Sequence, residues 1–151
     1  MSERISFESD IWQVDEYAEA ALSSLRTWKT SPPSVDEFRA LIESTTCSDC
    51  TYESFYYALP YVLDELEGRP SEDQFGMVSM LDWKLISAVD ADVPEGCHDQ
   101  LNAEQDRLTN LLVQILSAPG CPPEIIKYNL GAIAAVHGDP QLGNDIHAIG
   151  E

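Results

Sequence analysis

Basic residues are scarce in this sequence. Lys and Arg together number 8 against 27 Asp and Glu, which gives a formal net charge of −19 at pH 7. Nucleic acids and anionic lipid surfaces are bound mainly through Lys and Arg, so this balance argues against both as partners. A charged partner should instead be cationic, although a surplus of acid can also serve simply to keep a protein in solution.

The sequence also lacks a long apolar run. No stretch approaches the roughly 18 apolar residues that span a bilayer, and the N-terminus has no basic segment followed by an apolar one, as an export signal would. We therefore expect a cytoplasmic protein with no membrane contact, in which the four cysteines are free thiols. With 44% hydrophobic residues over a length of 151, the composition predicts one packed domain over residues 1–151.

Motifs for catalysis or metal binding are largely missing. Cys47 and Cys50 have the spacing of a metal knuckle or a redox pair, and Cys97 with His98, or Cys121, could complete a zinc site. A second closely spaced ligand pair is absent, however, and no glycine-rich phosphate loop or GxSxG elbow occurs. We predict no metal, no cofactor and no catalytic residues; a zinc- or thiol-dependent enzyme is the alternative that this cysteine pair leaves open.

Apolar residues recur at helical spacing along most of the chain. Over residues 9–29, for example, they follow one another at steps of three and four, which is the stripe of an amphipathic helix. Capping-box patterns at Ser34 and Ser71 indicate two further helix starts, and Pro60 should bend the helix that contains it. No segment shows the sustained alternation of a strand. The pattern predicts an all-α fold with helices near residues 9–29, 34–43, 52–67, 71–89, 101–117 and 122–137, followed by a short helix or tail over 138–151.

The middle of the chain contains an internal repeat. Apolar positions of 52–67 match those of 101–117 at an offset of 49, and positions of 71–89 match those of 122–137 at an offset of 47. Two helices per unit at a period of about 40–47 residues are typical of HEAT and armadillo repeats. The chain then divides into a helix pair over 9–43, two repeats over 50–136 and the segment 138–151. The matched residues are Leu59, Val62, Leu63 and Leu66 with Leu108, Leu111, Leu112 and Ile115, and Leu81, Ile86, Ala88 and Val89 with Tyr128, Ile133, Ala135 and Val136.

The segment from Cys50 to Leu66 resembles small bacterial HEAT-like proteins. In that family a Tyr-rich entry leads into a first helix of the Ala-Leu-Pro-Tyr type, and here Ala58 to Tyr61 read Ala-Leu-Pro-Tyr. Pro60 lies where a HEAT first helix commonly carries its bending proline. The resemblance covers residues 50–136, and 101–117 departs from it because it has no internal proline. It implies a HEAT-like stack of antiparallel helix pairs that binds other macromolecules along a groove or ridge, and an irregular helical bundle is the alternative.

The acidic composition and the missing catalytic groups favour a bacterial immunity or inhibitor protein. Such a protein would occlude the cationic active surface of a toxin, for example a nuclease, because carboxylates can replace the phosphates that a basic surface holds and opposite fields speed association. The alternative is a HEAT-like adaptor whose negative charge is incidental. We expect the interface on one continuous acidic strip along 52–67, 71–89 and the loop that follows. Its predicted carboxylates are Asp64, Glu65, Glu72, Asp82, Asp90, Asp92 and Glu95, and its predicted anchors are Tyr57, Tyr61 and Trp83.

Overall fold

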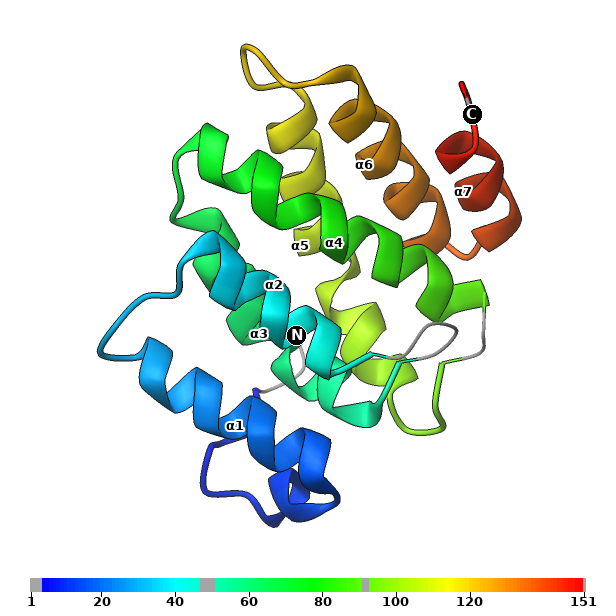
Figure 1. The fold of residues 1–151 in the computed structure, drawn as a ribbon. Coiled ribbons are helices and arrows are strands. Elements are labelled where there is room, and N and C mark those ends of the chain that lie inside the picture. Colours follow the sequence, from blue (N-terminus) through cyan, green and yellow to red (C-terminus); the bar gives the residue numbers. More distant parts are fainter. Residues whose placement is uncertain (1–3, 47–50, 91–92, 151) are drawn as a thin grey trace.

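A computed structural model describes residues 4–46, 51–90 and 93–150. Within these ranges no strand forms, and an isolated bridge joins Thr46 to Thr51, so the predicted all-α fold is confirmed (Figure 1). No described helix is long and apolar enough to cross a membrane. The elements are a 3₁₀ helix η1 (Asp10–Gln13) and the α-helices α1 (Glu16–Trp28), α2 (Val35–Ser44), α3 (Glu53–Glu67), α4 (Ser71–Asp90), α5 (His98–Leu116), α6 (Pro123–Val136) and α7 (Pro140–His147).

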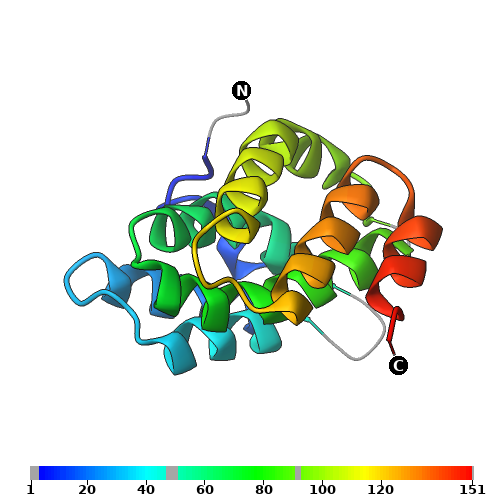
Figure 2. The same cartoon turned by 90° about the horizontal axis from the view of Figure 1, so that it is seen from above.

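The helices lie in two layers, as Figure 2 shows. In one layer α1 contacts α3 and α3 contacts α5, and in the other α2, α4, α6 and α7 contact one another in that order. From α1 to α6 consecutive helices alternate between the layers, so that α1 with α2, α3 with α4 and α5 with α6 form three successive contacting pairs. The pair α1 and α2 therefore lies at one end of the molecule and α7 at the other (Figure 1).

One of the two predicted capping boxes forms. The Ser34 hydroxyl accepts the Glu37 amide at 3.1 Å, and the Glu37 carboxylate accepts the Ser34 amide at 3.2 Å, as the box requires. The prediction for Ser71 is wrong, because Ser71 is itself the first residue of α4 and the Gln74 amide donates to the Pro70 carbonyl at 3.0 Å. The Gln74 side chain donates instead to the Leu66 carbonyl at 2.9 Å, which ties the start of α4 to the end of α3.

The predicted helix over 9–29 is divided in two. Asp15 has an extended backbone (φ −159°, ψ 175°), and its side chain accepts the Ala18 amide at 2.8 Å, so that α1 begins only after it. The preceding turn η1 carries Trp12, which is fully buried and donates its indole N–H to the Ser6 carbonyl at 3.0 Å. Trp12 thus reaches the core from η1 and not from α1.

Helix α3 contributes much of the core. Ten of its 15 residues are buried, because α3 contacts α1 on one side, α5 on the other and α4 in the second layer. Tyr56 is fully buried, and its hydroxyl lies 2.8 Å from the Thr51 hydroxyl. Buried apolar side chains from α1 through α6 join those of α3 in one cluster. Because α3 lies at the centre of the fold, even a polar aromatic residue such as Tyr56 is buried.

Candidate functional site

Two carboxylates of the predicted strip are paired with arginines of the same chain. Arg4 donates to Asp64 through both terminal nitrogens, one of them at 2.7 Å, and Arg107 donates to Asp64 at 2.6 Å. Burial alone would raise the pKa of Asp64, but the hydrogen bonds from these two arginines outweigh it and hold that pKa below its usual value. Glu65 lies 3.6 Å from Arg69. Much of the negative charge at the end of α3 is thus neutralised internally.

The two predicted tyrosine anchors form hydrogen bonds within the chain. Tyr57 is only 6% exposed, and its hydroxyl donates to Glu53 at 2.6 Å. Burial raises the pKa of Tyr57, and the hydrogen bond to Glu53 adds to that rise. Tyr61 is partly buried and donates its hydroxyl to the Ile5 carbonyl at 2.7 Å, which fixes the N-terminal segment on α3. Both hydroxyl groups are therefore already engaged within the chain.

Asp82 does not lie on the surface strip at all. Its side chain is fully buried, and in the described part of the chain neither carboxylate oxygen has a hydrogen-bond partner. Burial raises the pKa of Asp82 well above its usual range. The next residue, Trp83, is 48% exposed, with the Lys84 ammonium 4.8 Å from its ring centroid. The middle of α4 therefore exposes the Trp83 ring where a carboxylate was predicted, and Lys84 beside it is only 7% exposed.

The remaining members of the strip are far apart. Glu72 is exposed in the first turn of α4, and Glu95 is exposed beyond its last turn. A helix of 20 residues spans about 30 Å, so these two carboxylates are not neighbours. Asp90 is the last residue of α4, but its side chain lies outside the described part of the structure, as does Asp92. The described residues thus do not form the continuous strip that the sequence suggested.

Every basic side chain contacts another group of the chain. Besides the arginines already described, Arg26 and Arg39 donate to the carbonyls of Phe7 and Gly76, and Lys29 lies over the Phe7 ring. Arg69 also donates to the Pro33 carbonyl, and Lys127 donates to the Ile149 carbonyl at 2.9 Å. All eight cations therefore serve internal contacts, whereas many of the 27 acids face solvent.

The end of the molecule formed by η1, α1 and α2 shares this imbalance. Residues 10–44 hold seven acidic and three basic residues, and the three basic residues are Arg26, Lys29 and Arg39, which contact Phe7 and Gly76 as described. Most of the acidic side chains point into solvent. Those exposed on the two helices are Glu16, Glu19, Asp36, Glu37 and Glu43. Sequence reasoning missed this surface, although the run of carboxylates between 10 and 44 was visible in the sequence.

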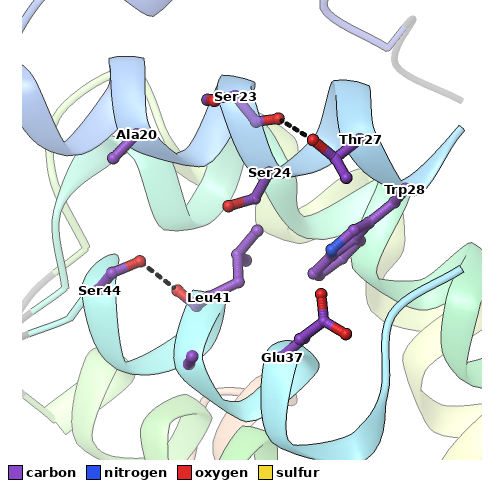
Figure 3. Close-up of a pocket in the computed structure, with 9 residues that line it drawn as sticks. Ala20, Ser23, Ser24, Thr27, Trp28, Glu37, Leu41 and Ser44 are labelled. Atoms are coloured by element: carbon purple, nitrogen blue, oxygen red, sulfur yellow. Dashed lines mark hydrogen bonds between the residues drawn. The ribbon is translucent and has the colours of Figure 1, made fainter. Parts of the chain in front are cut away.

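A groove of about 430 Å³ lies between α1 and α2 (Figure 3). The two helices pack closely where the rings of Trp28 and Phe38 stack, with centroids 6.2 Å apart. Elsewhere small side chains face the gap from both helices, among them Ser24 and Ala40. Figure 3 shows the Glu37 side chain and the Trp28 indole pointing toward each other across this groove. The groove thus combines Ser and Thr hydroxyls with the apolar side chains of Trp28 and Leu41, and Glu37 lies at its edge.

The described cysteines offer no reactive thiolate. Cys97 is buried and Cys121 partly buried, and both are free thiols. Burial raises the pKa of Cys97 to about 11, so the thiol stays protonated and unreactive near neutral pH. Cys47 and Cys50 lie outside the described residues. Among the residues that the structure does describe, no cluster of three or more His, Cys, Asp or Glu side chains could hold a metal ion.

Comparison of the chain with protein-family models, with curated proteins and with solved structures gives no match. The distribution of charge over the helices is therefore the main basis for a functional proposal.

Proposed function

We propose that this chain is an inhibitor that binds a cationic protein, such as a toxin with nuclease activity, and covers its basic surface, as an immunity protein does. The observation that carries the proposal is the division of charge within the fold. All eight cations make internal contacts, which leaves an excess of carboxylates in solvent. A protein surface that binds phosphates carries the complementary charge.

The docking face in this proposal is the acidic end formed by α1 and α2. Exposed carboxylates on both helices would attract a basic partner over a distance of about the screening length, roughly 8 Å at 0.15 M salt. The groove beside Glu37 would then receive a side chain of the partner at short range. The predicted contact on the loop after α4, with Asp90, Asp92 and Glu95, is the competing location within the same proposal.

Removing the same number of negative charges from each location shows which of the two contacts the partner. Two triple variants each remove three negative charges and keep side-chain size, and Gln at position 37 can keep the capping box. The partner is first co-purified with the intact chain from the native host, and its association rate with each variant is then measured over a salt series. The first variant is Asp36→Asn, Glu37→Gln, Glu43→Gln, and the second is Asp90→Asn, Asp92→Asn, Glu95→Gln.

We expect the α2 variant to associate about tenfold more slowly at low salt and with a flatter salt dependence, because electrostatic steering changes association rates by factors of about 10 or more. The loop variant should change the rate less. A larger effect of the loop variant would move the docking face to the predicted strip. Unchanged rates in both variants would rule out electrostatic recognition of a cationic partner.

The layered helix pairs support a second candidate, a HEAT-like adaptor. In a stack of helix pairs the first helices of successive pairs contact one another, as do the second helices, and the contacts of α1 with α3 and of α2 with α4 follow this order. An adaptor of this kind would bind through shape and apolar contact along a layer, so its association would respond weakly to salt. The same salt series therefore separates the two candidates.

A further inference from the structure

The end of the molecule opposite the acidic end carries an apolar groove. It lies between α6 and α7, has a volume of about 490 Å³, and is lined by Pro123, Ile126, Leu130, Ile146 and Ile149 together with one acid and one base. Leu130 is 44% exposed and Ile149 is 64% exposed. Exposed apolar surface of this kind on a folded protein commonly marks an interaction site.

The groove is built on a close helix contact. A Cβ atom placed on Gly143 would lie 2.7 Å from the Gly131 carbonyl oxygen, so α6 and α7 approach each other through two residues without side chains. Lys127 on α6 donates to the Ile149 carbonyl at 2.9 Å, which holds the end of the chain beside α6. Both contacts keep the apolar walls in place before anything binds.

The charge of the groove differs from that of the molecule. Its charged lining residues are Glu124 and Lys127, whose charges cancel, whereas the whole chain carries −19. A basic segment of a partner would find no excess of acid in this groove. Two copies of the chain repel each other over most of their surface, but the lining of this groove adds no net charge to that repulsion.

We propose that this face is the interface of a homodimer, in which the groove of one copy packs on the groove of another about a two-fold axis. In such an isologous interface every contact occurs twice: if one residue of the first copy faces a second residue of its neighbour, the same two positions also face each other with the copies exchanged. Glu124 of each copy can then pair with Lys127 of its neighbour. The Lys127 ammonium has three N–H donors, and the Ile149 carbonyl takes one of them. The apolar side chains of the two grooves would be removed from water together.

Sedimentation velocity on the intact chain, over a range of protein and salt concentrations, tests this proposal. We expect a monomer of 16.8 kDa that doubles in mass as its concentration rises. Leu130→Asp should weaken dimerisation at least tenfold, because it places a charge in the apolar contact. Val113→Asp is the matched control, since Val113 is also 44% exposed but lies on α5 outside the groove. Circular dichroism should show the same helix content in both variants.

A charge exchange tests the paired contact directly. Lys127→Glu alone and Glu124→Lys alone should each weaken the dimer, and the double variant should restore much of the loss because it re-forms the pair with reversed sign. Added salt should strengthen the dimer, since it screens the repulsion between two acidic copies, whereas it should weaken association with a cationic partner. The two proposals can therefore fail separately.

The homodimer is ruled out if the chain stays monomeric at high protein and salt concentration, or if Val113→Asp disrupts the dimer as much as Leu130→Asp. It is likewise ruled out if a different protein occupies the groove, in which case Leu130→Asp would abolish capture of that protein and leave the mass of the purified chain unchanged.

Discussion

At the scale of single residues, Asp82 is the most unusual group in the fold. Its carboxyl is fully buried, and within the described residues it accepts no hydrogen bond. An ionised carboxylate without a partner is expensive to bury, so such groups take up a proton instead. In agreement with this, burial raises the pKa of Asp82 well above its usual range. Burial therefore favours the protonated, neutral form of the Asp82 carboxyl.

We predict that Asp82 makes the protein less stable as the pH rises. The folded chain keeps the Asp82 proton at pH values where the unfolded chain has lost it, so unfolding releases a proton. The contribution of Asp82 is fully present below its unfolded pKa of about 4 and is lost as the pH rises toward the folded pKa. In that window the free energy of unfolding should fall by about 1.4 kcal/mol per pH unit relative to Asp82→Asn. Urea denaturation of both proteins between pH 4 and 9 measures this difference.

The comparison with Asp82→Asn removes contributions from other acids. Asp64, whose pKa is lowered by its arginines, acts in the opposite direction, since its contribution is lost when the pH falls, but it does so in both proteins. Parallel stability curves for the two proteins would mean that Asp82 ionises in the folded state as it does in the unfolded state. The conclusion that burial raises the pKa of Asp82 would then be wrong.

The burial of Asp82 could have been predicted from spacing alone. It lies four residues after Val78 and four before Ile86, both of them buried, so it shares their helix face. The acidic composition of the chain led us to place Asp82 on the surface instead. The pairing of Asp64 with Arg4 is a different case, because 60 residues separate the two and the contact depends on how the N-terminal segment crosses α3. No local pattern could have indicated it.

At the scale of elements, the crossing of α6 and α7 depends on two glycines. Gly131 and Gly143 are both buried, and a Cβ added to either would lie within 3.0 Å of the other's carbonyl oxygen. Because the obstructing atoms belong to the backbone, a side-chain rotation cannot relieve the overlap. The absence of side chains at these two positions therefore sets how closely α7 packs.

We predict that Gly143→Ala destabilises the protein by about 1–3 kcal/mol, the range for overpacked cores, although Ala usually favours a helix over Gly. Gly68→Ala is the matched control, since Gly68 has φ −80° and the nearest atom to its added Cβ lies 3.9 Å away. Chemical denaturation gives both values, and hydrogen exchange should show faster exchange in α7 of the Gly143 variant. Equal stability of the two variants would show that α7 can move away without cost.

The helices themselves were predictable because their apolar stripes recur at a period near 3.6 residues. The break at Asp15 was missed, since Glu16 to Trp28 continue the same apolar spacing. The extended backbone of Asp15 and the hydrogen bond that its side chain accepts from the Ala18 amide separate α1 from η1. Glycine disfavours a helix interior, yet Gly143 allows α7 to pack closely on α6. A glycine signals flexibility or close contact, and a single sequence does not tell which.

At the scale of the whole molecule, charge is divided between core contacts and surface. Cations hold segments together: Arg107, for example, joins α5 to α3 by donating to Glu67 at 2.7 Å and to the Pro60 carbonyl at 3.2 Å. Composition predicted an acidic surface, but it could not locate that surface, because the positions of the eight cations depend on tertiary contacts. The predicted strip is interrupted because Asp82 is buried and because arginines pair with Asp64 and Glu65.

This division predicts how salt acts on folding. With a net charge of −19, repulsion among carboxylates should outweigh the exposed ion pairs, which contribute about 0–1 kcal/mol each. Raising NaCl from 0.01 to 0.1 M shortens the screening length from about 30 to about 10 Å. We expect this to stabilise the fold by about 1 kcal/mol and raise Tm by about 2–4 °C. Thermal unfolding at low protein concentration, where the monomer dominates, measures the effect without a contribution from dimerisation.

Arg107→Gln should unfold at a lower temperature than the unmodified chain and gain more stability from salt, since the variant loses attractive ion pairs and becomes more acidic. A Tm that falls with salt in the unmodified chain would mean that the ion pairs around Asp64 stabilise the fold more than the excess negative charge destabilises it.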